Sequence, residues 1–172
     1  MPISMTPEQY FEAFTLGNYN DFLENQSSVM RAFNSAVAAS HLVDCYYYFY
    51  EKNDPVRVNI YPKLESFIDY LSRETNNYFR DINSIANAYK HLYARDKKHP
   101  EYSTISSAGT IESIRFIDEE VERVYEEPIE KNVSEFSVFY TRKTGEQIQF
   151  KQAIEVVVNF WETIISKSED LI

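Results

Sequence analysis

Residues 27–55 decide the fold of this 172-residue chain, and they read SSVMRAFNSAVAASHLVDCYYYFYEKNDP. A serine can cap the start of a helix here, and the final proline ends it, because the residue before proline disfavours helical dihedral angles. The apolar residues recur at the helical period and share one broad face: Val29, Ala32, Phe33, Ala36, Ala39, Val43, Tyr46, Tyr47 and Tyr50. The stretch therefore predicts a long helix, from Ser27 or Ser28 to about Glu51, that is buried against other helices.

The segments around this long helix are also helical in pattern. Residues 6–17 begin with a capping box formed by Thr6 and Gln9, and Gly17 is a natural helix stop. Apolar residues at helical spacing predict two further helical segments, which start after Pro62 and at Tyr78. The poor helix formers at 75–77 indicate either a kink in one helix or a break between two. The connection at 56–61 is either one short strand or an extended linker.

The C-terminal third changes to the alternating period of β-strands. Residues 136–140 alternate between apolar and polar side chains, a Lys-Thr-Gly-Glu turn follows, and Ile148 and Phe150 begin a return strand. Two more strands are expected at 111–117 and 121–125. The final stretch, residues 151–166, has clear helical periodicity and one strongly apolar face.

These elements predict an α+β fold that is mainly α, organised as one domain over residues 1–172. An up-down bundle of four helical segments occupies residues 6–95, and a polar loop follows at 96–110. A small antiparallel β-sheet at 111–150 and the C-terminal amphipathic helix complete the domain. The last helix has to bury its apolar face against the bundle or the sheet, which is why we expect one domain rather than two.

Composition excludes several classes of function. Three glycines are too few for a Walker loop, a dinucleotide-binding fingerprint or a hydrolase nucleophile elbow. One cysteine and three histidines argue against a Cys/His zinc site, and we expect no cofactor. The formal net charge of −10 argues against a nonspecific polyanion binder, so we expect no DNA partner. Eight acidic and two basic residues lie between 118 and 135, so the helical part is closer to neutral.

The same features predict a cytoplasmic protein. No apolar run reaches the roughly 20 residues that a membrane helix requires, so we expect no membrane association. The N-terminal residues carry no signal-peptide pattern. Cys45 is the single cysteine, which suits a reducing compartment.

A polar stripe runs along the helix expected at 78–94. It contains Arg80, Asn83, Asn87 and His91, which lie on one face over three turns. A histidine that acts as general acid or base, with an arginine that stabilises a charged intermediate, is sufficient for metal-independent RNA cleavage.

This stripe resembles the HEPN group of small helical proteins, which is found among bacterial toxins and phage-defence systems. Active members carry Arg, often followed by a polar residue, and then His four to six residues beyond the Arg. Asn87 and His91 match the polar and His positions, whereas Ala86 stands where the family has Arg. The resemblance implies a HEPN-like bundle over residues 28–95 of a bacterial or phage-type protein. Ribonuclease activity would then need Arg80, or an arginine from a second subunit, in place of the missing one.

A second constellation combines His41 and Asp44 with His91. The first two are three residues apart on the long helix, so their side chains point the same way. Together with His91 they could ligate a divalent metal, or form a hydrogen-bonded His–carboxylate pair. We favour ordinary solvated or inter-helix hydrogen bonding, because nothing in the sequence brings the two helices' polar faces together.

The third candidate is the tyrosine run on the long helix, for which we expect Tyr46, Tyr47, Tyr48 and Tyr50 to form an interface. Such rings suit either base stacking or an aromatic helix–helix contact, within the subunit or across a dimer. The acidic charge favours the helix–helix contact. The sequence therefore predicts a non-enzymatic interaction or regulatory module, which binds a second copy or another protein, with RNA as a less favoured partner.

Overall fold

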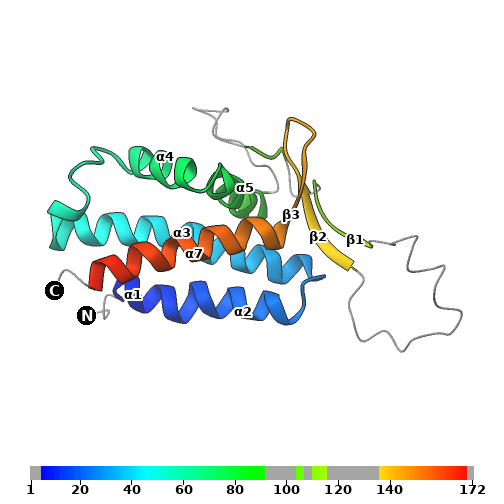
Figure 1. Ribbon diagram of the computed structural model, residues 1–172, viewed down its shortest axis with the longest axis horizontal. Helices are drawn as coiled ribbons and strands as arrows, with labels where there is room; N and C mark the ends of the chain where they lie inside the picture. Colours follow the sequence, from blue (N-terminus) through cyan, green and yellow to red (C-terminus); the bar gives the residue numbers. More distant parts are fainter. Residues whose placement is uncertain (1–4, 92–103, 107–109, 116–135, 170–172) are drawn as a thin grey trace, which may run out of the picture.

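The computed structural model describes residues 5–91, 104–106, 110–115 and 136–169 of the chain. Within these residues the fold is α+β and mainly α, as the sequence predicts: helices are packed side by side, and a small antiparallel sheet stands at one end of them (Figure 1).

The N-terminal helix is continuous through α1 (Pro7–Tyr10), a π-helical turn η1 (Phe11–Leu16) and α2 (Gly17–Glu24). The expected capping box is confirmed, since the Gln9 amide donates to the Thr6 hydroxyl at 3.2 Å and the Thr6 amide donates to the Gln9 side chain at 3.0 Å. The expected stop at Gly17 is wrong, because this glycine is helical with φ −58° and ψ −49°. Continuing the helix buries Phe22, which packs edge-on against Phe150 at 5.0 Å between ring centroids.

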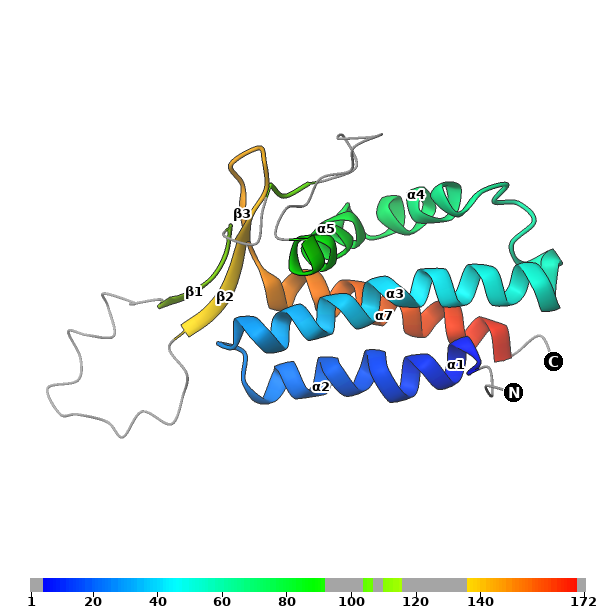
Figure 2. The ribbon, with the colours of Figure 1, turned by 180° about the vertical axis from the view of Figure 1, so that it is seen from behind.

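The long central helix is confirmed as α3 (Val29–Asn53), which is capped by Ser28: its hydroxyl accepts from the Arg31 amide at 3.2 Å. In Figures 1 and 2, α3 runs between α1–α2 on one side and α4–α5 on the other, with α7 across a third side. This placement explains why twelve of its 25 residues are buried. The described residues cover the fourth side of α3 only in part.

The connection after α3 forms no strand. It consists of a short 3-10 turn, η2 (Pro55–Arg57), and further turns that lead to α4 (Leu64–Glu74). The break at 75–77 separates α4 from α5 (Tyr78–His91), so these are two helices rather than one kinked helix. Asn76 and Asn77 reverse the chain with φ of +52° and +65°, a conformation that asparagine tolerates.

The sheet has the strand order β1 (Ile111–Arg115), β2 (Phe136–Thr141) and β3 (Gln147–Gln149), and all of its pairs are antiparallel. The turn between β2 and β3 contains Gly145 at φ +89°, which lies in the region that favours glycine. The strand expected at 121–125 lies outside the described residues, as does most of the loop expected at 96–110.

The C-terminal helix α7 (Phe150–Glu169) begins directly after β3 and docks on the bundle as expected. Its Trp161 is buried, contacts the Tyr46, Phe67 and Phe79 rings, and donates its indole N–H to the Ala39 carbonyl at 3.2 Å. One cluster of buried side chains joins the helices and the sheet. Across the described ranges, no helix is both long and apolar enough to span a bilayer.

Candidate functional site

Three of the four tyrosines expected at an interface lie inside the chain. Tyr46, Tyr47 and Tyr50 are 6%, 4% and 6% exposed. Tyr46 stacks on Phe67 at 5.5 Å between ring centroids, and the Tyr47 hydroxyl donates to the Tyr61 carbonyl at 2.9 Å. The Tyr50 hydroxyl donates to the Glu8 carboxylate. These rings form an aromatic helix–helix contact within the subunit, with polar tips that find partners at the rim of the core.

The fourth tyrosine, Tyr48, is 54% exposed and belongs to the side of α3 that the described residues cover only in part. The other residues on this side precede Tyr48 along the helix at spacings of three or four residues. Met30, at the far end of this side, is 64% exposed. His41 is exposed, and the remaining members are half-buried. We call this surface the open face of α3, and its members are Met30, Asn34, Val37, His41, Asp44, Cys45 and Tyr48. By helical periodicity it lies roughly opposite Ala39, whose carbonyl accepts from the Trp161 indole of α7.

Aromatic side chains of the N-terminal helix border the open face. The Tyr10 ring lies 5.8 Å from the His41 ring and 5.1 Å from the Phe14 ring, between centroids. Phe14 is 45% exposed, and it belongs to the π-helical turn. Such turns are rare and occur frequently at functional sites. Burial disfavours the charged phenolate and raises the pKa of Tyr10 to about 12, with a further contribution from Cys45.

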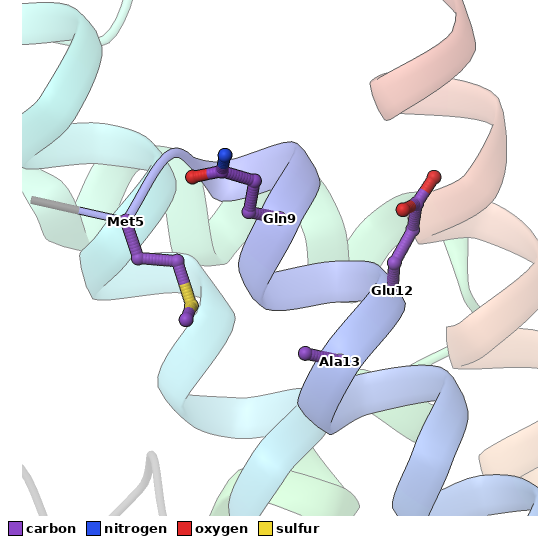
Figure 3. Close-up of a pocket in the computed structure, with 4 residues that line it drawn as sticks. All are labelled: Met5, Gln9, Glu12 and Ala13. Carbon is purple, nitrogen blue, oxygen red and sulfur yellow. The ribbon is translucent and has the colours of Figure 1, made fainter.

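An open hollow lies on the outer side of the same helix, lined by Met5, Gln9, Glu12 and Ala13. In Figure 3, Met5 and Glu12 lie on opposite sides of Ala13, and Gln9 lies between them, above Ala13. The hollow offers one carboxylate and one amide beside apolar atoms. This lining suits contact with another surface better than the enclosure of a small molecule.

The structure places His41 on the open face, next to Tyr10, and Asp44 one turn further along α3. The α5 stripe approaches α3 beside His41, since the Ser40 hydroxyl donates to the Asn83 side chain at 2.6 Å. Within the part of the chain that the structure describes, no three His, Cys, Asp or Glu residues are grouped to hold a metal. The His91 side chain lies outside that part, so a site shared by His41, Asp44 and His91 stays a prediction.

The polar stripe on α5 divides into residues with different surroundings. The Arg80 guanidinium is 11% exposed and forms an ion pair with Asp69 on α4, so an acidic partner neutralises its charge. Asn83 accepts from Ser40, and Asn87 is exposed. His91 is the last residue of α5. The combination of Arg80, Asn87 and His91 as a ribonuclease site stays a prediction.

The strongest polar cluster of the described residues was not predicted from the sequence. Asp81 on α5 is fully buried, and its carboxylate accepts from the Tyr140 hydroxyl at 2.6 Å and from the Arg142 guanidinium at 2.6 and 3.0 Å. Arg142 also binds Glu146 at 2.8 Å. Burial, with the adjacent Asp81 carboxylate, raises the pKa of Tyr140 well above its usual value, and the hydrogen bonds to Asp81 raise the pKa of Arg142.

This cluster fastens the β2–β3 hairpin to α5, and the Asp81 carboxylate is satisfied by its donors, so we assign it to structure. A signal for it was present in the sequence. Asp81 lies on the apolar stripe of its helix, three residues after Tyr78 and four before Ile85. A lone carboxylate at such a position needs a buried donor, although the sequence does not say which one.

No protein-family model, curated protein or solved structure matches this chain. The function therefore has to be argued from the chain's own geometry, and the HEPN resemblance stays a prediction.

Proposed function

We propose that this protein is a non-enzymatic interaction module, built on a HEPN-like helical bundle, that binds a protein partner through the open face of α3. One observation carries the proposal. Seven large apolar side chains are exposed among the described residues; Met30 and Tyr48 lie on the open face, and Phe14 borders it through Tyr10.

Scattered exposed apolar residues are normal on a protein surface, whereas a group along one face marks a site of association. Tyr and Met are enriched in protein interfaces, where an aromatic ring provides contact area and its hydroxyl stays hydrated at the rim. The open face is also preorganised, because the opposite side of the same helix is packed into the core around Tyr46 and Trp161. A rigid face loses little conformational entropy on binding.

The polar groups of the open face are poorly suited to nucleophilic chemistry. Burial, together with the neighbouring Asp44 carboxylate, raises the pKa of the Cys45 thiol above its usual value. A raised pKa lowers the fraction of reactive thiolate at neutral pH. We therefore place His41, Asp44 and Cys45 in a binding surface rather than in a catalytic site.

The class of partner follows from charge and from the single thiol. A chain with a formal net charge of −10 repels nucleic acid phosphates, which favours a protein partner. Its one cysteine suits an interaction that takes place in the reducing cytoplasm.

Site-specific photo-crosslinking in cells that naturally make the protein tests this proposal. A benzophenone-bearing phenylalanine analogue replaces Tyr48 in one variant and Glu155 in a control, because Glu155 is exposed on α7 away from the open face. We expect a discrete crosslinked product from position 48 and none from position 155. The absence of any product at position 48, in a variant with native circular dichroism, would overturn the proposal.

A further inference from the structure

We infer that the occupant of the open face is a second copy of this chain, with the two α3 helices packed antiparallel about a twofold axis that crosses the open face at the level of residue 39. This inference rests on the proposed function and adds the partner and the geometry of the contact.

The open face forms one strip along α3. Its positions 30, 34, 37, 41, 44 and 48 are separated by four or three residues, so they lie in line on the helix surface, and we call this strip the seam. Apolar residues occupy positions 30, 37 and 48 of the seam, and polar residues occupy positions 34, 41 and 44. A strip of this mixed kind can pack along a second helix if each residue meets a complementary one.

The seam is complementary to itself when the second copy runs antiparallel. With the axis at the level of Ala39, Met30 faces Tyr48 of the second copy, and Val37 faces its His41. A thioether against an aromatic ring is a favourable contact. The third pair places the Asn34 amide opposite the Asp44 carboxylate, where the amide can donate. A parallel arrangement would instead place the two Asp44 carboxylates against each other, which costs free energy.

The distribution of charge also favours a second copy at this face. Two chains that each carry −10 repel each other over most of their surfaces. The open face contributes a single carboxylate, Asp44, beside six uncharged residues when His41 is neutral. Two copies therefore approach here against less repulsion than their total charge implies.

The dimensions fit an interface of moderate size. The seam from Met30 to Tyr48 is about 27 Å long at the α-helical rise. At 54% and 45% exposure, the Tyr48 and Phe14 rings offer roughly 100 Å² each. Phe14 is next to Tyr10, whose ring lies beside His41, so Phe14 borders the seam. A stable dimer buries about 800 Å² per partner, so the N-terminal helix has to contribute alongside α3.

Cysteine crosslinking of the purified full chain tests the antiparallel register. In a Cys45→Ser background, Met30→Cys and Tyr48→Cys are combined in one variant and made singly in two others. Within one chain these positions are about 27 Å apart, too far for a disulfide. We expect the double variant to form a disulfide-linked dimer under mild oxidation, at least tenfold faster than either single variant. Circular dichroism confirms the fold of each variant.

Three results would overturn the inference. Single variants that crosslink as fast as the double variant would indicate a parallel or nonspecific contact. Crosslinking of a control pair placed away from the face, Arg73→Cys with Glu155→Cys, at the same rate would indicate random collision. A double variant that stays uncrosslinked at high concentration would exclude the second copy. In that last case, a photo-crosslinked product at Tyr48 in cells would show that the proposed function survives with a different protein as partner.

Discussion

The two sides of α3 show how one helix can serve both folding and binding. Tyr47 and Tyr48 are adjacent in sequence, yet Tyr47 is 4% exposed and Tyr48 is 54% exposed. The 100° rotation between successive helical residues directs one ring into the core against Tyr61 and Phe67 and the other into solvent. Residue type alone therefore does not assign a role to these tyrosines. Their role depends on which side of α3 the neighbouring helices cover.

The two sides of α3 should differ most in how much the free energy of unfolding falls when a large side chain is truncated to alanine. Trp161→Ala removes a buried indole, its contacts with the closed side of α3 and its hydrogen bond to Ala39. We expect a loss of about 3–5 kcal/mol in the free energy of unfolding, measured by chemical denaturation. Tyr48→Ala, on the open side, should change the unfolding free energy of the monomer by less than about 0.5 kcal/mol. Equal losses in the two variants would contradict the contrast.

A second test extends the contrast to buried and exposed carboxylates. Asp81→Asn removes the buried carboxylate that pairs with Arg142 and leaves only the exposed Glu146 as its acidic partner, while the asparagine oxygen can still accept from Tyr140. We expect a loss of about 2–3 kcal/mol, below the value for a fully buried ion pair because Arg142 is partly exposed. Glu12→Gln, an exposed carboxylate on η1, is the control and should be neutral within about 0.5 kcal/mol. Thermal or denaturant unfolding measures both losses. Equal losses of unfolding free energy in Asp81→Asn and Glu12→Gln would count against the assignment of Asp81 to structure.

The fold and the open face could be predicted to different extents from the sequence. The central helix, the capping box, the break at 75–77, the hairpin and the C-terminal helix follow from local periodicity and turn residues. The continuation through Gly17 does not, because it is stabilised by the burial of Phe22 against Phe150, which is 128 residues away in sequence. The π-helical turn is equally hidden, since no local residue pattern predicts it.

The candidate site was predicted only in part for a similar reason. Helical periodicity places Tyr48 and His41 off the apolar stripe of α3, but it does not indicate whether another element covers them. The Asp81 cluster joins residues that are about sixty positions apart, on a helix and a strand. A long-range pairing of this kind depends on the topology of the whole chain, which a local pattern does not contain.

A third prediction compares the removal of one hydroxyl group on each side of α3. Tyr47→Phe removes the hydrogen bond to the Tyr61 carbonyl and leaves the ring in place. We expect a loss of about 1 kcal/mol in unfolding free energy, since the half-buried carbonyl loses its donor. Tyr48→Phe removes a solvated hydroxyl and should have no measurable effect on the monomer. Denaturation midpoints compared at an equal m-value measure both changes.

The smallest expected effect concerns Tyr10, at the edge of the open face. Its folded-state pKa of about 12 lies above the ordinary value of about 10, so the neutral phenol is favoured in the folded chain. The stability that this shift contributes is fully present below about pH 10 and is lost as the pH rises through about 12. Tyr10→Phe should therefore lose less stability than the wild type between about pH 9 and pH 11.5. Urea unfolding at several pH values measures this difference. An equal loss of unfolding free energy with pH in the wild type and in Tyr10→Phe would contradict a raised pKa for Tyr10.

The central claim is that one side of α3 folds the chain and the other side binds a second copy of the chain. Sedimentation equilibrium of the wild type and of Tyr48→Asp over a wide concentration range tests it most directly, together with denaturant unfolding of both proteins. We predict that the wild-type mass rises towards that of a dimer, whereas Tyr48→Asp stays monomeric with an unchanged free energy of unfolding for the monomer. Identical sedimentation of the two proteins would contradict the claim.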